Sequence, residues 1–293
     1  MLTLRGSMVA LVTPFRDGAV DLRAFRAFVQ WQLDQGTDGL VPCGTTGEGA
    51  TLTAEEHGQV VRLCAEVAKG RAPVIAGCGT NSTRTTIENV QRAREAGADA
   101  ALVVTPYYNK PSQEGLFRHF EAVAKEGGLP VVLYNVPGRT AVDLLAETVA
   151  RLAKVPGIVG IKEASGQIAR VAEIRAAGAE QLTILAGDDL FTLPTLAMGG
   201  QGVISVVGNV APADLAMLCD AFADGNLEAA RNAQIRFAPL VKALFCESNP
   251  LPVKHALACM RKMSPELRMP LCSVGPESAA KIEKALAEYG GLL

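Results

Sequence analysis

Short apolar runs, rich in β-branched residues, alternate with amphipathic segments along most of the chain. The spacing between successive runs is about 20 to 35 residues, which suits a strand plus a returning helix. The runs cover residues 8–14, 38–44, 73–79, 100–106, 130–137, 158–164, 182–189 and 202–209. This pattern predicts eight strand–helix units.

The segments between the runs carry helix signals. Residues 21–36 place apolar side chains near a 3.6-residue period and end on a glycine. Thr53, with Glu56 three positions later, forms a capping-box pattern, and Ser82 opens the next helix. Nearly continuous apolar strands alternating with helices indicate a parallel sheet that is covered outside. Eight such units favour an α/β fold of the closed (β/α)8 TIM-barrel type.

A doubly wound open sheet is the alternative architecture. Such a sheet usually needs fewer strands, and the chain shows no glycine fingerprint of the dinucleotide-binding kind. After about residue 224 the apolar runs stop, and residues 226–245, 250–263 and 276–290 have helical patterns. We therefore expect a barrel over residues 1–224 and a small helical C-terminal domain over residues 225–293.

Composition and charge limit the possible partners. The chain is 49% hydrophobic and 20% charged, with a formal net charge of −2, so no nucleic-acid surface is indicated. No apolar run reaches the roughly 18 residues of a membrane span, and the first residues lack signal-peptide features. Seven cysteines without a CxxC pair suggest reduced thiols in a cytoplasmic protein.

Lys162 ends the apolar run at 158–164, where a buried strand is expected. In (β/α)8 enzymes the active site lies at the carboxyl ends of the strands. Side chains alternate across a strand, so inward-facing Tyr134 and Lys162 on neighbouring strands would share one pocket. A desolvated lysine amine can form a Schiff base with a carbonyl, and a phenol can carry protons. The alternative is a lysine that snorkels into solvent or forms an ion pair.

Other strand ends offer weaker signals. The backbone amides of the GTTGEG loop at residues 44–49 could bind an anion such as a carboxylate. Alternatively, its glycines could be present only because the loop needs positive φ angles. Arg139 could bind a second carboxylate or lie on the surface. Tyr107 and Tyr108 could equally be packing aromatics.

A metal site is not predicted. Asp188 and Asp189 would need further ligands, and the histidines at 57, 119 and 255 lie in helical stretches rather than at strand ends.

Five motifs resemble the 4-hydroxy-tetrahydrodipicolinate synthase (dihydrodipicolinate synthase) family of pyruvate-dependent class I aldolases and lyases. They occur in order and span nearly the whole chain, as GTTGEGATLT, TPYYNKPSQEGLFRHF, YNVPGRT, GIKEASG and NPLPVKHAL. The wider family, which includes N-acetylneuraminate lyase, shares the lysine strand and a similar glycine loop. The GTTGE form together with NVPGRT is typical of the synthases.

The resemblance implies a lyase of lysine and diaminopimelate biosynthesis. Lys162 would form a Schiff base with pyruvate, and the resulting enamine would attack L-aspartate 4-semialdehyde, without any cofactor or metal. Tyr134 would be the proton shuttle in a hydroxyl relay with Thr45 and Tyr108, the latter from a neighbouring subunit of a homotetramer built as a dimer of dimers. Four residues would bind the substrates pyruvate and semialdehyde: Thr46, Arg139, Gly187 and Ile204.

One departure concerns feedback inhibition, since the resemblance implies a lysine-binding site in many members. The chain keeps His57, Asn81 and Tyr107 at matching positions. It has Ala54 where inhibited members can carry a histidine, and Thr85 where they carry a glutamate. We expect lysine inhibition to be weak or absent.

Two other functions stay open from the sequence. A sister aldolase acting on a sugar acid, such as N-acetylneuraminate, would use the same lysine, although Arg139 argues against it. A barrel that serves only as a binding or scaffold protein would not need Lys162, Tyr134, Thr45 and Thr46 together.

Overall fold

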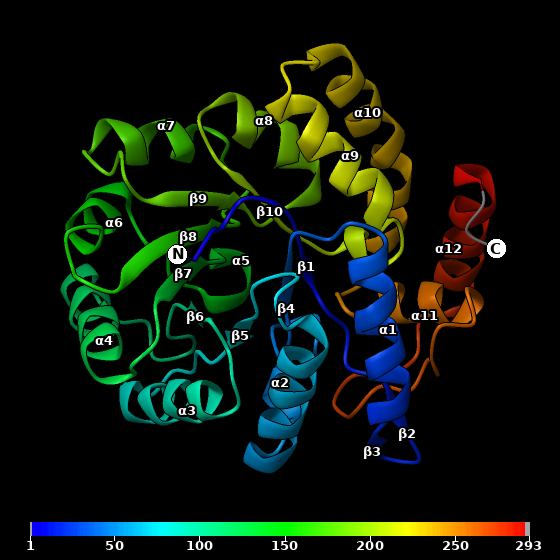
Figure 1. Cartoon of the computed structure of the whole chain (residues 1–293), viewed down its shortest axis with the longest axis horizontal. Coiled ribbons are helices and arrows are strands. Elements are labelled where there is room, and N and C mark those ends of the chain that lie inside the picture. The colour runs from blue at the N-terminus through cyan, green and yellow to red at the C-terminus, as the bar shows by residue number, and fades with distance from the viewer. Residues whose placement is uncertain (1, 291–293) are drawn as a thin grey trace.

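Eight parallel strands form the centre of the molecule in the computed structural model, which describes residues 2–290. Seven of the eight predicted apolar runs contain one of them, and the first run, residues 8–14, overlaps the first strand, which begins two residues earlier. The strands are β1 (Gly6–Ala10), β4 (Gly39–Val41), β5 (Ile75–Gly77), β6 (Ala100–Val104), β7 (Val131–Asn135), β8 (Ile158–Glu163), β9 (Thr183–Ala186) and β10 (Gly202–Ser205). Figure 1 shows them surrounded by helices.

The sheet closes on itself. Its hydrogen-bonded order is β4-β1-β10-β9-β8-β7-β6-β5, and a parallel bridge between Leu40 and Val74 joins the two ends. The Leu40 amide donates to the Pro73 carbonyl at 3.0 Å, and the Gly77 amide donates to the Pro42 carbonyl at 2.9 Å. The (β/α)8 barrel is therefore confirmed, and the open-sheet alternative is excluded.

Helices return the chain from each strand to the next along the outside of the barrel (Figure 1). Thr53 and Glu56 form the predicted capping box, and the Ser82 hydroxyl accepts the Thr85 amide. These helices are α1 (Leu22–Asp34), α2 (Ala54–Ala68), α3 (Thr83–Glu95), α4 (Gln113–Glu126), α6 (Ala146–Leu152), α7 (Ala169–Ala176), α8 (Thr192–Ala197) and α9 (Pro212–Ala223).

Several short elements lie in the loops between the strands and helices of the barrel. They are the hairpin β2 (Phe15–Arg16) and β3 (Ala19–Val20), the short helix α5 (Pro137–Thr140), and the 3₁₀ turns η1 (Gly49–Thr51), η2 (Asp189–Phe191) and η3 (Val207–Asn209). Among the described residues, no helix has both the length and the apolar character needed to cross a bilayer.

Two apolar clusters result from strand alternation. One fills the barrel interior and includes Met8, Val132, Tyr134, Leu185 and Ile204. The other lies between the sheet and the surrounding helices and takes the alternate residues of the same strands. Tyr134 thus points into the barrel, which meets the condition under which strand alternation predicted a pocket shared with Lys162.

Three helices follow the barrel: α10 (Leu227–Leu244), α11 (Leu251–Cys259) and α12 (Pro276–Tyr289). Helix α10 packs against α9 and α12, and α11 packs against α12 (Figure 1). A helical C-terminal part is therefore present, while its separation as a domain at residue 225 stays a prediction.

A buried ion pair ties α11 to the barrel. Lys254 and Glu48 are both fully buried at the side chain and contact each other through Nζ and Oε1. Lys254 Nζ also donates to the Glu266 carbonyl at 2.7 Å, and the other Glu48 oxygen accepts the Arg268 amide at 3.0 Å. Burial lowers the pKa of Lys254 despite the adjacent carboxylate. Each charge therefore depends on the other for its stability.

His119 on α4 is buried, with 4% of its surface exposed. Its Nδ1 lies 2.9 Å from the Thr83 hydroxyl, whereas Nε2 has no hydrogen-bond partner among the described residues. Burial lowers the pKa of this imidazole from its usual 6.5 to about 4. In the folded protein His119 therefore stays neutral over a pH range in which the same residue of the unfolded chain takes up a proton.

We predict that Lys254→Met lowers the free energy of unfolding by about 3 to 5 kcal/mol, because Glu48 would be left buried without its cation. Urea denaturation measures this. The matched control is Lys284→Met, which removes an exposed pair with Glu288 and should cost less than about 0.5 kcal/mol. A Lys254→Met protein within about 1 kcal/mol of the parent would contradict the prediction.

We also predict a pH-dependent stability term from His119. Between pH 7 and pH 5 the unfolded imidazole becomes protonated while the folded one stays neutral, so the free energy of unfolding falls. The drop should be about 2 kcal/mol larger in the parent protein than in His119→Gln. Denaturant titrations at both pH values test this, and parallel pH profiles of the two proteins would show it to be wrong.

Candidate active site

Pairing of β7 with β8 brings Tyr134 and Lys162 together. The two residues are direct partners in the parallel register, and Lys162 Nζ lies 4.5 Å from the centre of the Tyr134 ring. Lys162 is 5% exposed and Tyr134 is 7% exposed. The structure thus joins the two residues that strand alternation predicted to meet, and the lysine does not reach solvent.

Lys162 forms no ion pair with any residue that the structure describes. Within residues 2–290 no carboxylate oxygen lies within 4.0 Å of its Nζ. An ammonium in this position would be desolvated without the compensation that a carboxylate gives to Lys254. The site therefore suits an amine that is consumed in a covalent bond.

The loop at residues 44–49 follows β4, and neighbouring backbone leaves no room for a side chain at two of its glycines. A side chain at Gly47 would lie 2.9 Å from the Leu11 carbonyl, and one at Gly49 would overlap the Cys43 carbonyl. Positive φ angles occur instead at Cys43 and Glu48, at 58° and 52°. Gly47 and Gly49 are thus needed for close backbone approach, whereas Gly44 has open space around it, and none of the three has the positive φ that the alternative required.

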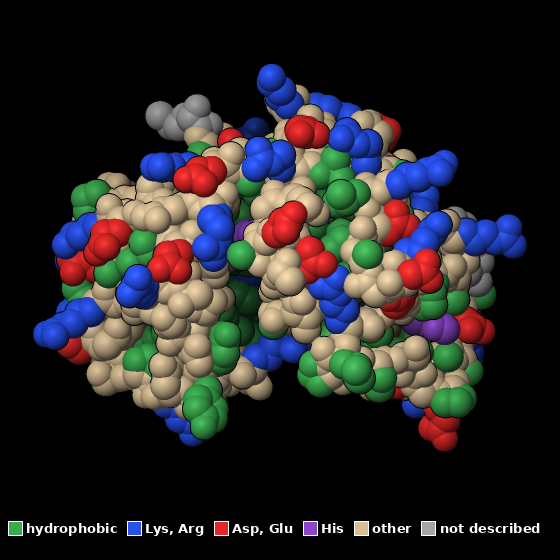
Figure 2. All heavy atoms as spheres, turned by 90° about the horizontal axis from the view of Figure 1, so that it is seen from below, with side chains coloured by type: hydrophobic (Ala, Val, Ile, Leu, Met, Phe, Trp, Pro, Cys, Tyr) green, Lys and Arg blue, Asp and Glu red, His purple; other side chains and the backbone are tan. Residues whose placement is uncertain are grey.

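The predicted hydroxyls of this loop differ in their surroundings. Thr45 lines a cavity of about 620 Å³, together with Tyr107, Tyr134 and Arg139. Thr46 is 2% exposed, and its hydroxyl accepts a hydrogen bond from the Asn249 side-chain amide at 3.0 Å. The space-filling view shows a hollow in one face, with acidic and basic side chains interspersed around it (Figure 2).

Asn249 is a residue that the sequence analysis missed. It precedes α11, bonds Thr46 through its amide, and accepts Arg139 Nη2 at its backbone carbonyl at 3.0 Å. Its side-chain Oδ1 is buried and has no partner among the described residues. The only sequence signal was its place at the start of the NPLPVKHAL motif. Asn249 links two predicted substrate-binding residues from different parts of the barrel.

Tyr108 is not brought to the cavity within one chain. Tyr107 lines the cavity, but Tyr108 is 89% exposed and has a φ of 71°. The PYYN pattern could not show that only the first of the two tyrosines lines the cavity. A role of Tyr108 across a subunit boundary stays a prediction.

Gly187 and Ile204 lie beside the Lys162 strand end and in the barrel interior, respectively. The Gly187 amide donates to the Glu163 carbonyl at 2.7 Å, and a Cβ at this position would lie 2.6 Å from that of Ala164. Ile204 pairs with Met8 across β10 and β1 and belongs to the interior cluster that contains Tyr134. Neither residue is among those lining the cavity.

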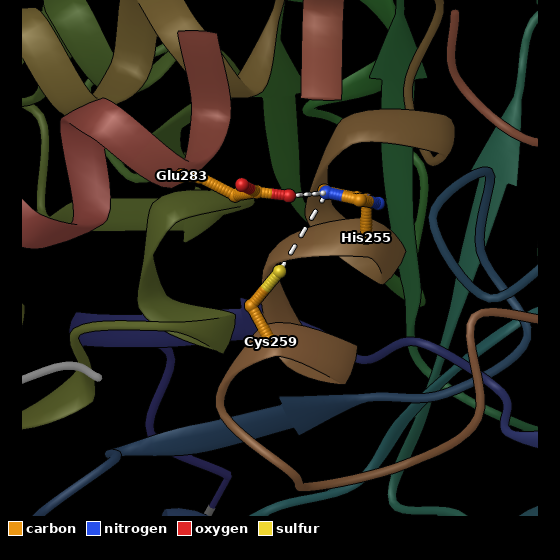
Figure 3. Close-up of side chains that lie close together, drawn as sticks. All are labelled: His255, Cys259 and Glu283. Atoms are coloured by element: carbon orange, nitrogen blue, oxygen red, sulfur yellow. Dashed lines mark hydrogen bonds and ion pairs between the residues drawn. The ribbon is translucent and has the colours of Figure 1, made fainter. Parts of the chain in front are cut away.

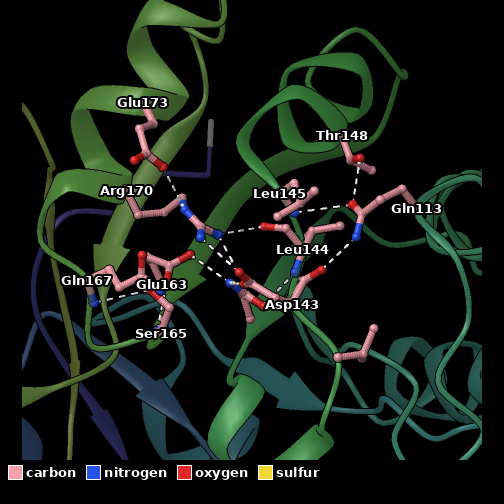
Figure 4. A network of polar contacts seen from close by, with 12 residues as sticks. Gln113, Asp143, Leu144, Leu145, Thr148, Glu163, Ser165, Gln167, Arg170 and Glu173 are labelled. Atoms are coloured by element: carbon pink, nitrogen blue, oxygen red, sulfur yellow. Dashed lines mark hydrogen bonds and ion pairs between the residues drawn. The ribbon is translucent and has the colours of Figure 1, made fainter.

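A polar network holds the ends of β7 and β8 together on the outer side of the barrel (Figure 4). The Asn135 amide donates to Asp143 at 2.8 Å and to Glu163 at 3.1 Å. Arg170 donates to both oxygens of Asp143, at 3.0 and 2.8 Å, and holds the pKa of that carboxyl below its usual range. Because Asn135 and Glu163 directly follow Tyr134 and Lys162, the network fixes the strand segments that carry the candidate catalytic pair.

The two acidic residues after β9, Asp188 and Asp189, accept hydrogen bonds from backbone amides. Asp189 is buried and accepts the Ser205 hydroxyl and the amides of Val206 and Val207, each amide at 3.1 Å. Asp188 accepts the Leu190 amide at 2.9 Å. The Asp189 bonds join the end of β9 to the end of β10, whereas the Asp188 bond caps the short turn η2.

Comparison with known proteins places this geometry in a family. The model of the "Dihydrodipicolinate synthetase family" matches residues 3–289. A protein named 4-hydroxy-tetrahydrodipicolinate synthase from Anaeromyxobacter dehalogenans is 53% identical over 291 residues, covering 99% of each chain. The solved dihydrodipicolinate synthase of Aquifex aeolicus superposes with a TM-score of 0.96 at 42% identity, covering 99% of each chain.

A further solved relative is a chloride-inhibited dihydrodipicolinate synthase from Acinetobacter baumannii, described as complexed with pyruvate. It has a TM-score of 0.96 and 44% identity, covering 99% of this chain and all of the other. Family model, sequence relatives and structures agree over nearly the whole length. The chain belongs to the dihydrodipicolinate synthetase family.

Proposed function

We propose that the chain condenses pyruvate with L-aspartate 4-semialdehyde to give 4-hydroxy-tetrahydrodipicolinate, a step of lysine and diaminopimelate biosynthesis. The family membership supports this reaction. The observation that carries it is Lys162, a buried amine that forms no ion pair within residues 2–290 and lies against the Tyr134 ring at the carboxyl end of a barrel strand.

The chemistry begins at Lys162 Nζ, which attacks the ketone carbon of pyruvate and releases the carbonyl oxygen as water. Loss of a methyl proton from this Schiff base gives an enamine, and its terminal carbon attacks the aldehyde of the semialdehyde. The amino group of the second substrate then displaces Lys162 as the ring closes. Tyr134 moves protons in these steps, in a relay with Thr45 and Tyr108.

Substrate binding is divided among the other site residues. Thr46 holds the pyruvate carboxylate, and Ile204 and Gly187 enclose the pyruvate side. Arg139 binds the carboxylate of the semialdehyde through its planar guanidinium. Asn249 positions both Thr46 and Arg139, because it bonds each of them directly.

The remaining expectations belong to the same proposal. The reaction needs no cofactor, since the covalent bond to Lys162 supplies the activation. The protein works in the cytoplasm as a homotetramer in which Tyr108 completes a neighbouring site. Residues 1–224 form the catalytic barrel, and residues 225–293 form a helical domain that supports it.

We predict that borohydride, added with pyruvate, attaches a pyruvate-derived group to Lys162 and inactivates the protein. Lys162→Ala should take up no label and lose roughly 10³-fold or more of its activity, because no Schiff base can form. The exposed Lys281→Ala is the matched control and should behave as the parent. Peptide mass spectrometry and pyruvate consumption measure both effects.

The acceptor is tested separately with the parent protein. Pyruvate consumption with aspartate semialdehyde, and not with N-acetylmannosamine or short sugar aldehydes, is the expected result. Turnover with a sugar aldehyde alone would keep the role of Lys162 and overturn the proposed acceptor. Full activity in Lys162→Ala would overturn both.

We predict that lysine inhibits weakly or not at all, with an inhibition constant in the millimolar range or above it. Ala54 and Thr85 both line the cavity, and neither has a carboxylate that could bind the ammonium of lysine. The Thr85 hydroxyl is hydrogen-bonded to the Ser82 hydroxyl at 3.0 Å. Thr85→Glu should lower the constant at least about tenfold, whereas the neutral Thr85→Gln should not. Submillimolar inhibition of the parent would contradict this.

A further inference from the structure

Three side chains with metal-binding atoms meet between α11 and α12. His255 and Cys259 lie one turn apart on α11, and Glu283 reaches them from α12 (Figure 3). His255 Nε2 is 3.3 Å from Glu283 Oε1 and 3.6 Å from Cys259 Sγ. The three potential ligand atoms all lie within 4.8 Å of one another.

Hydrogen bonding alone does not satisfy this arrangement. A neutral imidazole nitrogen carries either a proton or a lone pair, so Nε2 donates or accepts but does not do both. One of its two contacts, to the carboxylate or to the sulfur, therefore lacks a strong bond. A cation placed between the three groups would use a lone pair from each of them.

The separations match those of a tetrahedral zinc site. Typical bond lengths of about 2.0 Å to nitrogen or oxygen and about 2.3 Å to sulfur, at tetrahedral angles, place nitrogen and oxygen roughly 3.3 Å apart. The same geometry places nitrogen and sulfur roughly 3.5 Å apart. The observed 3.3 and 3.6 Å agree with these two values, and the third separation, from the Cys259 sulfur to the Glu283 oxygen, is no more than 4.8 Å.

We propose that His255, Cys259 and Glu283 bind one zinc-class divalent cation, with water at the fourth position. Imidazole and thiolate favour zinc or cobalt over magnesium or calcium, which prefer oxygen ligands. The cation has access from solvent, because the Glu283 side chain is 56% exposed and that of His255 is 23% exposed.

The site is structural. Helix α11 starts next to Asn249 and carries Lys254, so it bears the contacts that hold Thr46 and Glu48. A cation bound by His255 and Cys259 on α11 and by Glu283 on α12 joins this helix to the last helix of the chain. Binding stabilises the fold without entering the reaction, and it does not depend on the proposed function.

The i, i+4 spacing of His255 and Cys259 is the sequence signal that was overlooked. The expectation of no metal site came from the strand ends and from the lack of a CxxC pair. A histidine and a cysteine four positions apart on one helix share a face. The third ligand, from α12, becomes visible only when the two helices pack.

The test uses the full chain, stripped with a chelator and kept reduced, with Co²⁺ as a spectroscopic probe and then Zn²⁺. One equivalent of Co²⁺ should give a thiolate-to-cobalt charge-transfer band, which Zn²⁺ removes by displacement. Zn²⁺ at a hundredfold excess over its Kd should raise the Tm by about 5 °C.

Variants then locate the site. Cys259→Ser should lose the cobalt band and the zinc-dependent rise in Tm, and His255→Gln should lose most of both. The exposed Cys272→Ser is the matched control and should keep them. Absence of the band in the parent, or a band that persists in Cys259→Ser, overturns the proposal. Circular dichroism and pyruvate labelling of each variant establish that it is folded.

Discussion

The parallel register between β7 and β8 is the constraint on which the site depends. Direct pairing of Tyr134 with Lys162 sends both side chains to the same interior, and a shift by one residue would send one of them outward. Closure of the sheet then fixes where the other strands end, so that loops from distant parts of the chain meet at one rim. The network of Asn135, Asp143 and Arg170 holds this register from the outer side.

Two buried lysines show how the same side chain serves two purposes. Lys254 is fully buried, faces Glu48, and donates to a backbone carbonyl, so its charge is matched and its role is to hold α11 on the barrel. Lys162 is nearly as buried and lacks a carboxylate partner in the described chain. An amine buried without a carboxylate partner costs stability unless it is used in another way, which is why Lys162 and not Lys254 is the candidate for covalent chemistry.

The C-terminal helices contribute to the site more than their position in the chain suggests. Asn249 bonds Thr46, which lies 203 positions away, and Glu48 and Lys254 are 206 positions apart. Motif patterns marked both segments but not the bonds between them. Periodicity reports local structure, whereas these contacts arise from loop closure over most of the chain.

The sequence by itself determined the eight strand–helix units, the alternation that lets Tyr134 and Lys162 share one pocket, and the capping box at Thr53, because each depends on neighbours within a few residues. The five motifs also pointed to the family. Only the tertiary structure decided that Gly47 and Gly49 serve close packing, that Tyr108 is exposed and does not line the cavity of its own chain, and that Asn249 bonds both Thr46 and Arg139. Such features depend on which distant backbone segments approach one another, and local alternation of polar and apolar residues carries no information about that.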